Sequence, residues 1–513
     1  MALSTSSLVL GLSLSLLIFA LVKYSLKKAS LPLPPGPRQL PFIGAARQID
    51  TLKPWVTYAQ WGAKYGDIIS CNLFGQRTVV LNSEKAADDL LERRSRFYSD
   101  RPAHSARSMA GWDFNFTFDG YGNDWRLTRR IFQQAFREQK VRDYQPAQLN
   151  AARRLVVNIM DAPAESVWDL LSLCTSSAIL ATVYGYEVDT LDDPFFNITN
   201  QALTTAMPLL IPGKARITDA FPFVKHLPTF LPGTSVVRES LLARKWAKLF
   251  SDVPFNFAID KMQSEQAFSC VLADAIRHGR ENDQNYPESN LKKAVSTAFA
   301  GGADTSTSTL QSLVIAMALN PAVQEKAHAD LVAVVGMDRL PTFEDQTSLS
   351  YIDAIVRETM RWGPVVPLGV SHAVMEDDVY EGYFIPKGST IVANAWAMSR
   401  DPRRYPDPEA FRPERFLTKE GALSDDDVRW SFGWGRRICP GRYSALNAIW
   451  AAAATMMFAY RFEKATDENG LPIDITPEWT CALVSRPKAI PVHIVRRLDK
   501  VKLAQLIEES KHE

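Results

Sequence analysis

The sequence predicts a mainly α-helical protein with small β sheets. Helical hydrophobic periodicity dominates residues 84–362, whereas short, proline-punctuated strand patterns occupy residues 363–416 and 471–497. The 513 residues are 46% hydrophobic and 22% charged, which is typical of a globular enzyme with a large core. The formal net charge of +1 gives no overall attraction to nucleic acid, so no nucleic-acid partner is expected.

The first 22 residues differ from the rest of the chain. They carry no charge, include the run "LVLGLSLSLLIFALV", and are followed by Lys23, Lys27 and Lys28. This length can cross a bilayer, and the lysines predict a lumenal N-terminus with a cytosolic body. A cleaved signal peptide is the alternative, but a basic n-region and a small-residue cleavage pattern are missing. We therefore expect residues 1–22 to be the single transmembrane anchor.

Residues 23–44 combine basic side chains with the proline-rich run "LPLPPGPRQLPFIG". Prolines at this density do not fit inside helices or strands. The segment is predicted to be a stiff, extended hinge that orients the body against the membrane. Residues 45–513 then form one compact domain.

Within that domain, several elements have recognisable boundaries. Residues 62–81 are predicted to contain a β-hairpin with Gly75 and Gln76 at its turn. Asn320 and Pro321 are predicted to start a helix that ends at Gly336. A further, almost entirely apolar helix, "YSALNAIWAAAATMMFAY", is predicted after Cys439.

The cysteines are few, scattered and odd in number, and none forms a CxxC pair: Cys71, Cys174, Cys270, Cys439 and Cys481. A disulfide framework or structural zinc site is therefore not expected, and the body is predicted to face a reducing compartment.

One of these cysteines, Cys439, lies in the cationic, glycine-rich stretch "SFGWGRRICPGRYS". Because Pro440 suits the first position of a helix, we expect Cys439 at a helix N-terminus. The helix dipole and the nearby Arg436, Arg437 and Arg442 would lower the thiol pKa. Such a cysteine serves as a nucleophile, a redox sensor or a metal ligand, and no histidine pairs recognisably with it. A metal held by one thiolate implies a cofactor that supplies the other ligands, as haem does.

The spacing of Phe432, Gly435, Arg437, Cys439 and Gly441 resembles the haem-binding loop of the cytochrome P450 family. This resemblance implies the family's α-rich triangular prism behind the anchor, and a haem-thiolate monooxygenase domain over residues 45–513. It also implies that Cys439 is the axial thiolate of haem b.

A second motif, "AFAGGADTSTS", lies within a long helical pattern. Two glycines inside a helix cost about 1 kcal/mol each relative to alanine, and close helix packing alone would explain them. The resemblance instead implies a local distortion above the haem at Gly301 and Gly302. It further implies that Thr305 hydrogen-bonds bound dioxygen and that Asp304 relays protons from solvent.

Other motifs agree in order along the chain. Glu358 and Arg361 share one helix face, which by itself would suggest a surface ion pair of little energetic value. In the family, this pair and a second arginine, here Arg415 in "FRPERF", lock the fold.

The resemblance also assigns the haem propionates to three cations and one aromatic residue. They are Trp125, Arg129, His372 and Arg437, which would hold the carboxylates by charge-assisted bonds.

The implied reaction inserts one oxygen atom of O2 into a C–H bond of a lipophilic small molecule, with electrons from NADPH through a separate NADPH–cytochrome reductase that docks on basic residues. The implied substrate is a secondary metabolite such as a terpenoid or polyketide, or a xenobiotic aromatic or steroid-like compound. The pocket residues implied by the resemblance, for each of which core packing is the alternative, are Trp112, Phe114, Phe116, Phe299, Ala303, Val365, Val366, Leu368, Ala482 and Leu483.

The anchor and hinge are similar to those of eukaryotic microsomal members, which implies a single-pass protein of the endoplasmic reticulum membrane with a cytosolic catalytic domain. Alternatives are a haem-thiolate sensor or carrier without turnover, a haem-thiolate isomerase, a peroxygenase and a sterol demethylase. The intact Asp304–Thr305 pair favours a monooxygenase over the first three.

Overall fold

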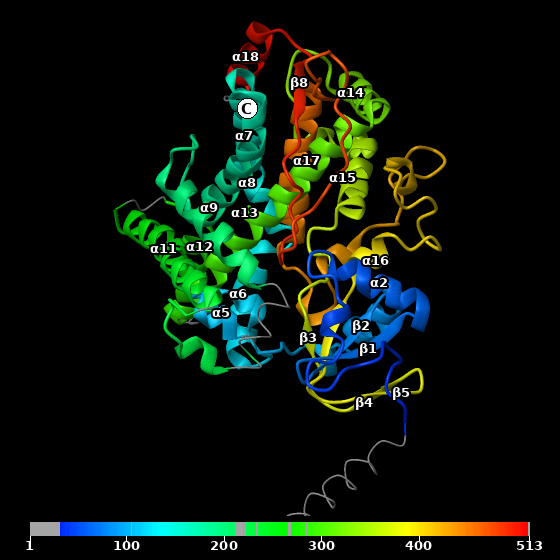
Figure 1. Cartoon of the computed structure of the whole chain (residues 1–513). Helices are drawn as coiled ribbons and strands as arrows, with labels where there is room; N and C mark the ends of the chain where they lie inside the picture. The colour runs from blue at the N-terminus through cyan, green and yellow to red at the C-terminus, as the bar shows by residue number, and fades with distance from the viewer. Residues whose placement is uncertain are drawn as a thin grey trace, which may run out of the picture.

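The computed structural model describes residues 31–510, apart from 104, 211–218, 220–221, 232–233, 265–267 and 283–285. The predicted anchor, residues 1–22, and the start of the hinge, residues 23–30, lie outside the described residues. Helices form most of the molecule, and the strands gather mainly in one part of it, beside α2 (Figure 1). The prediction of a mainly α-helical protein with small sheets is confirmed.

The α-helices have the following bounds: α2 Pro54–Tyr65, α3 Glu84–Ala87, α4 Ser95–Tyr98, α5 Ser105–Met109, α6 Asn123–Phe136, α7 Gln145–Asp161, α8 Val167–Tyr184, α9 Pro194–Ala206, α11 Ser235–Ser264, α12 Val271–Glu281, α13 Glu288–Leu319, α14 Pro321–Val335, α15 Ser350–Trp362, α16 Ala395–Ser399, α17 Arg442–Ala459 and α18 Lys500–Glu509. Short 3-10 turns and one π-helical segment, η2 (Asp88–Arg93), connect them.

The largest sheet has four strands in the order β1-β2-β6-β3, with bounds β1 Ile68–Leu73, β2 Gln76–Leu81, β6 Thr390–Ala393 and β3 His372–Ala373. Strands β1 and β2 form an antiparallel hairpin, β2 pairs with β6 in parallel, and β3 pairs with β6 in antiparallel fashion. Two further antiparallel pairs are β4 (Asp378–Tyr380) with β5 (Tyr383–Ile385) and β7 (Tyr460–Lys464) with β8 (Val492–Arg496).

The predicted hairpin is present, but its turn lies one residue earlier than expected. Leu73 pairs with Gln76, so Phe74 and Gly75 form the turn. Both have positive φ, 51° and 85°, as a two-residue turn between twisted strands requires. Gly62 belongs to α2 and lies outside the hairpin.

The described part of the proline-rich hinge, residues 31–44, lies against the sheet. Ser70 of β1 donates from its backbone N–H to the Pro35 carbonyl at 2.8 Å and from its hydroxyl to the Pro34 carbonyl at 2.6 Å. A side chain on Gly36 would place its Cβ 2.0 Å from the Ser70 carbonyl oxygen, so only glycine allows this approach. Residues 32–39 form no helix or strand, whereas residues 40–44 form a tight turn closed by the bridge between Leu40 and Gly44. The described part of the hinge therefore belongs to the folded body, and the prediction of an extended spacer is wrong for residues 40–44.

The centre of the molecule is α13, which packs against α6, α8, α11 and α17. Among the described residues, one helical stretch is long and apolar enough to cross a membrane, residues 164–184, and 72% of its apolar window is buried. It contains α8, which packs between α7 and α13, so it is a core helix of the folded body.

Two predicted helix starts have different outcomes. Helix α14 begins at Pro321 and ends before Gly336, as expected, although the Asn320 side chain donates to the Ala316 carbonyl and does not cap α14. Helix α17 begins at Arg442 with Gly441 as its N-cap. Pro440 therefore precedes the helix, and the prediction that it occupies the first helical position is wrong.

The predicted strands of the C-terminal tail are only partly present. Strand β8 forms as expected, while residues 471–491 consist of turns and isolated bridges, such as the bridge between Trp479 and Pro487.

Candidate active site around Cys439

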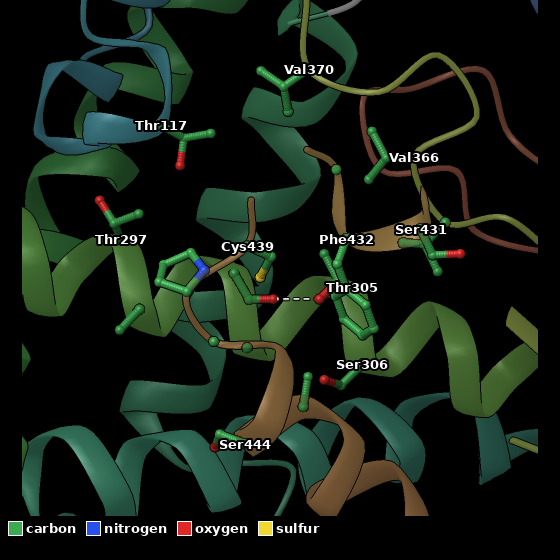
Figure 2. Close-up of a pocket in the computed structure, with 18 of the residues that line it drawn as sticks. Thr117, Thr297, Thr305, Ser306, Val366, Val370, Ser431, Phe432, Cys439 and Ser444 are labelled. Carbon is green, nitrogen blue, oxygen red and sulfur yellow. Dashed lines mark hydrogen bonds between the residues drawn. The ribbon is translucent and has the colours of Figure 1, made fainter. Parts of the chain in front are cut away.

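A cavity of about 300 Å³ lies between α13, the segment after α15 and the loop that carries Cys439. Figure 2 shows Cys439, Phe432 and Thr305 around this space, with Val366 and Val370 on one side. The cavity therefore brings together residues from segments more than three hundred positions apart.

Backbone geometry shapes the cysteine loop. The Cys439 N–H donates to the Phe432 carbonyl at 2.8 Å, which closes the loop. Gly435 has φ of 55°, and a Cβ there would lie 2.2 Å from the Leu91 carbonyl oxygen. Its N–H donates to Glu92 at 2.7 Å. Gly435 is not among the residues that line the cavity, so we correct its predicted cofactor contact to a packing role against η2.

The other two glycines of the loop, Gly433 and Gly441, do line the cavity, as do Phe432 and Trp434, of which the sequence did not single out Trp434. The indole of Trp434 donates to Asp88 at 2.7 Å, which ties the loop to η2 a second time.

The electrostatic environment of Cys439 differs from the expectation. Burial raises the pKa of the thiol, while a hydrogen bond from the Gly441 N–H and the charges of Arg129 and Arg442 lower it. The predicted net lowering of the pKa is therefore wrong for the free thiol. Because a bound metal cation deprotonates its thiol ligand, the residues that oppose the burial effect would support a thiolate once iron is present.

Three buried arginines surround the same cavity. Arg129 and Arg437 were expected there, and Arg101, which precedes α5, was not singled out from the sequence. Each donates to backbone carbonyls: Arg101 to Val370, Ser371 and Thr117, Arg129 to Ile438, and Arg437 to Ser99 and Asp119, at 2.5–3.0 Å.

No carboxylate among the described residues forms an ion pair with these three side chains. The Nε of Arg129 and one terminal nitrogen of Arg437 are buried without a hydrogen-bond partner. Burial lowers the pKa of both guanidinium groups to about 10, and burial together with Arg437 lowers that of Arg101 well below its usual value. Burial of a cation without a counter-ion costs free energy, so the group of three arginines fits a ligand that carries carboxylates.

Two aromatic rings complete this end of the cavity. Arg437 lies over the Trp125 ring at 4.0 Å, a cation–π contact, and Trp125 also lines the cavity. The His372 Nδ1 donates to the Tyr98 carbonyl at 2.6 Å, so Nε2 is the ring nitrogen that can hydrogen-bond another group. Burial and Arg101 lower the pKa of His372, so a carboxylate beside it would have to restore its proton.

The helix α13 carries Thr305 into the cavity. The Thr305 hydroxyl donates to the Gly301 carbonyl at 2.7 Å (Figure 2). A Cβ on Gly301 would meet no described atom, whereas one on Gly302 would lie 2.8 Å from Ile179 of α8. Gly301 thus keeps space open and Gly302 permits helix packing. The helix is continuous over Glu288–Leu319, so the predicted local distortion is not observed.

Asp304, the neighbour of Thr305, points away from the cavity. It is 2% exposed, and its Oδ1 accepts from Arg486 Nε at 2.6 Å. Its Oδ2 is buried without a partner among the described residues. Burial raises the pKa of this carboxyl, and Arg486 partly offsets the effect. Asp304 therefore reaches solvent only through its contact with Arg486, and its predicted part in proton relay stays a prediction.

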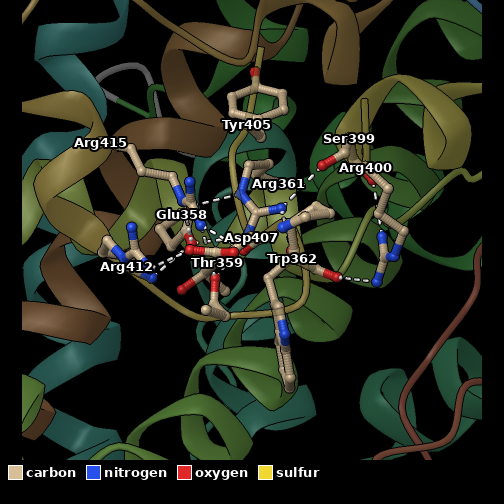
Figure 3. A network of polar contacts seen from close by, with 12 residues as sticks. Glu358, Thr359, Arg361, Trp362, Ser399, Arg400, Tyr405, Asp407, Arg412 and Arg415 are labelled. Carbon is tan, nitrogen blue, oxygen red and sulfur yellow. Dashed lines mark hydrogen bonds and ion pairs between the residues drawn. The ribbon is translucent and has the colours of Figure 1, made fainter. Parts of the chain in front are cut away.

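Glu358, Arg361 and Arg415 form the buried network that the sequence predicted (Figure 3). Glu358 and Arg361 are both 0% exposed and make two hydrogen bonds at 2.6 and 2.7 Å. The remaining Arg361 donors reach the carbonyls of Ser399, Pro408 and Ala410, and Arg415 Nε lies 3.4 Å from Glu358. The network joins α15 to the irregular segment before the cysteine loop.

The structure confirms three of the ten predicted pocket residues, Phe116, Val365 and Val366, as cavity lining. Trp112, Phe114 and Phe299 instead stack on Phe250 at centroid distances of 6.0, 5.8 and 4.2 Å.

The other four predicted pocket residues also lie outside the lining. Ala303 is buried beside α8, where its carbonyl accepts from Thr175. Leu368 packs in a separate apolar cluster with Trp55. Ala482 and Leu483 belong to a turn near the C-terminus, residues 480–486. Lining residues that sequence analysis missed include Thr117, Thr297, Ala298, Ile179 and Val370.

One cavity of this α-rich fold thus brings together a thiol and three buried arginines that pair with no carboxylate in the described part of the chain, a combination that fits a haem-thiolate protein. The family model "Cytochrome P450" matches residues 34–493, which is most of the chain. The chain belongs to the cytochrome P450 family.

The curated relatives are fungal monooxygenases of similar length. "Cytochrome P450 monooxygenase ple1" of Rhodocybe pseudopiperita is 38% identical over 481 residues, 92% of this chain and 91% of the relative. "Cytochrome P450 monooxygenase COX2" of Coprinopsis cinerea is 36% identical and covers 90% and 89%, and "Cytochrome P450 monooxygenase 136" of Postia placenta is 35% identical and covers 95% and 93%. This protein is therefore a cytochrome P450 monooxygenase, an oxidoreductase that uses haem and O2.

Proposed function

We propose that this protein is a membrane-anchored monooxygenase that hydroxylates a C–H bond of a lipophilic small molecule, with electrons from NADPH through a separate NADPH–cytochrome reductase. The observation that carries the proposal is the convergence of Cys439, Arg101, Arg129 and Arg437 on one cavity. Bound haem b supplies the activation of dioxygen. The chain's own residues hold the cofactor, orient the substrate and supply protons.

In this proposal, Cys439 would supply the thiolate ligand of the haem iron and the three arginines would hold the two propionates, with Trp125 and His372 beside them. The unpartnered nitrogens of Arg129 and Arg437 support the assignment, because a carboxylate would satisfy them. Thr305 lies on the cavity wall opposite the cysteine loop, where its hydroxyl is available to a proton-transfer step.

The substrate is proposed to be a secondary metabolite such as a terpenoid or polyketide, or a xenobiotic aromatic or steroid-like compound. The substrate side of the cavity is lined mainly by apolar side chains, including Phe116, Val366 and Val370, with isolated hydroxyls from Thr117 and Thr297 (Figure 2). Such a surface favours an apolar molecule with few polar groups.

The protein is further proposed to be a single-pass protein of the endoplasmic reticulum membrane, anchored by residues 1–22 and with its catalytic domain in the cytosol. Large apolar side chains are exposed within the hinge, at Leu40 and Phe42, and shortly after it, at Leu52. Phe223 and Phe230, which follow α9 in the chain, are 61% and 82% exposed. Exposed apolar residues of this size are typical of surfaces that contact a membrane or a partner.

The reductase is proposed to dock near the cysteine loop. Arg126 and Arg130 are exposed on α6, Arg137 follows its end, and Arg436 is exposed on the loop itself. A cluster of exposed cations on this side complements an acidic partner and would speed its association.

A carbon monoxide difference spectrum of the reduced, purified protein tests the proposed haem ligation. We expect the Soret band of a thiolate-ligated haem. A protein without porphyrin, or with an imidazole-type spectrum, would contradict the assignment. Compounds that shift the spin state are then incubated with NADPH and a fungal reductase, and hydroxylated product is expected. Binding without NADPH consumption would instead indicate a sensor or carrier.

Thr305→Ala is expected to retain haem and substrate binding but to release reducing equivalents as hydrogen peroxide. The hydroxyl is lost on the cavity wall, so product formed per NADPH should fall about tenfold or more. Thr307→Ala is the matched control, because Thr307 lies on the same helix but hydrogen-bonds Thr175 of α8. Product, NADPH and peroxide are measured together. Full coupling in Thr305→Ala would refute the role of this residue.

Arg101→Gln is expected to weaken haem retention roughly ten- to hundred-fold, because charge-assisted hydrogen bonds contribute about 1.5–3 kcal/mol each. The rate of haem loss to an excess of an apoprotein acceptor measures this effect without any turnover. Arg96→Gln, an exposed arginine five residues earlier, is the control. An unchanged rate of haem loss in Arg101→Gln would remove Arg101 from the propionate site.

A further inference from the structure

The C-terminal turn, defined here as residues 480–486, is closed by its own hydrogen bonds. The Thr480 N–H donates to the Arg486 carbonyl at 2.8 Å, and the Arg486 N–H donates back to the Thr480 hydroxyl at 3.0 Å. The Ser485 hydroxyl donates to the Thr480 carbonyl at 2.8 Å. These bonds join the two ends of the turn to each other.

Two contacts fasten this turn to α13. The Arg486 guanidinium contacts Asp304, and the Ser308 hydroxyl donates to the Ser485 carbonyl at 2.7 Å. Asp304 and Ser308 are one helical turn apart, so both face the C-terminal turn. The Asp304 side chain is 2% exposed and that of Arg486 is 27% exposed, which places the ion pair at the edge of the core.

The same turn also braces the cavity wall. The Ser485 N–H donates to the Val365 carbonyl at 2.8 Å, and Val365 and Val366 line the cavity. The opposite wall is α13, with Gly301 and Thr305. The C-terminal turn thus connects the two walls from outside the cavity, through Asp304 and Ser308 on one side and Val365 on the other.

We propose that Arg486 is a positioning residue that acts through Asp304: their ion pair locks the C-terminal turn to α13 and so holds the Val365 wall at a fixed distance from Thr305. This inference rests on the proposed monooxygenase function. Arg486 itself does not line the cavity. It controls how tightly the substrate is held beside Thr305, and hence the share of electrons that reach product.

Removal of the Arg486 charge leaves Asp304 buried and unpaired. A buried carboxylate that has lost its partner either takes up a proton or draws in water, and either change loosens the turn. Ser308 and Val365 each contribute only one neutral hydrogen bond to the turn. The ion pair between Arg486 and Asp304 is therefore the strongest of the three contacts that hold the turn in place.

The experiment compares Arg486→Gln, Arg486→Lys, Asp304→Asn and the double variant Arg486→Gln/Asp304→Asn in the haem-loaded protein. Lys488→Gln is the control, since Lys488 is two residues further on and pairs with Glu478 at the surface. Hydrogen–deuterium exchange of residues 480–486 measures how readily the turn opens, and it needs no turnover. Spin-state titration with a lipophilic substrate measures substrate affinity, and product formed per NADPH measures coupling.

For Arg486→Gln we expect at least tenfold faster exchange in the turn, several-fold weaker substrate binding and more peroxide. Arg486→Lys is expected to recover much of the wild-type behaviour. Asp304→Asn is expected to match Arg486→Gln, with no further loosening of the turn in the double variant, because the two residues act as one unit.

Unchanged exchange in Arg486→Gln, or additive effects on exchange in the double variant, would overturn the proposed lock. Faster exchange with unchanged substrate binding and coupling would overturn its link to the cavity. The carbon monoxide spectrum distinguishes failure of this inference from failure of the proposed monooxygenase function. Arg486→Gln is expected to retain the thiolate-type band, so loss of the lock leaves the haem ligation intact.

Discussion

Replacing Cys439 with alanine is expected to abolish the thiolate-type Soret band and all monooxygenase activity. No other described cysteine lines the cavity, so no second thiol can replace it as the iron ligand. The arginine cluster should still bind the propionates, so some haem is expected to remain, with an altered spectrum. The carbon monoxide difference spectrum and product formation measure the loss.

The matched control is Cys481→Ala, which removes a partly buried thiol from the C-terminal turn, outside the cavity lining. This variant should keep the wild-type spectrum. Retention of the thiolate-type band in Cys439→Ala would show that another group ligates the iron, and the assignment of the whole site would fail.

The second large effect is expected for Glu358→Gln, which should lower the free energy of unfolding by about 3–5 kcal/mol. The substitution keeps the side-chain shape but leaves Arg361 as a charged, fully buried group without a counter-ion. Arg415 also loses its contact with Glu358, and the segment that precedes the cysteine loop is released (Figure 3). Denaturant unfolding and the haem content of the purified protein measure the effect.

Glu187→Gln provides the comparison, because the Glu187 side chain is 68% exposed and pairs with Arg154 at 2.6 Å on the surface. Its loss should cost no more than about 1 kcal/mol. Equal stability losses in the two variants would mean that the Glu358 network has no special part in the fold.

Several site residues could be found from the sequence because each belongs to a short motif with fixed spacing. Cys439 with Phe432 and Gly441, and Glu358 with Arg361, are close in the chain, so local geometry determines which face each presents. The structure brings Cys439, Phe432 and Gly441 to one cavity and buries Glu358 against Arg361. Gly435 was also found, but it packs against the Leu91 carbonyl and donates to Glu92, 343 positions away in the chain, and no local pattern reveals these partners.

Residues that act through distant partners were missed or misplaced. Arg101 has no motif around it, and it becomes a candidate site residue only when it is found buried at one cavity with Arg129 and Arg437, none of them in an ion pair with a described carboxylate. Asp304 was assigned a part in proton relay beside Thr305, but adjacent helix residues point about 100° apart, and the sequence did not show that Asp304 pairs with Arg486.

The sequence by itself determined the family and the class of reaction, and it predicted Cys439 as the thiolate ligand, because these depend on residue type and short-range spacing. Only the tertiary structure decided which aromatic residues line the cavity and which stack on Phe250, and how Arg486 reaches Asp304 across 182 positions. Packing and ion pairs of this kind depend on contacts between distant segments. The energetic cost of a buried charge likewise depends on the groups that the fold brings around it, and a sequence does not show these groups.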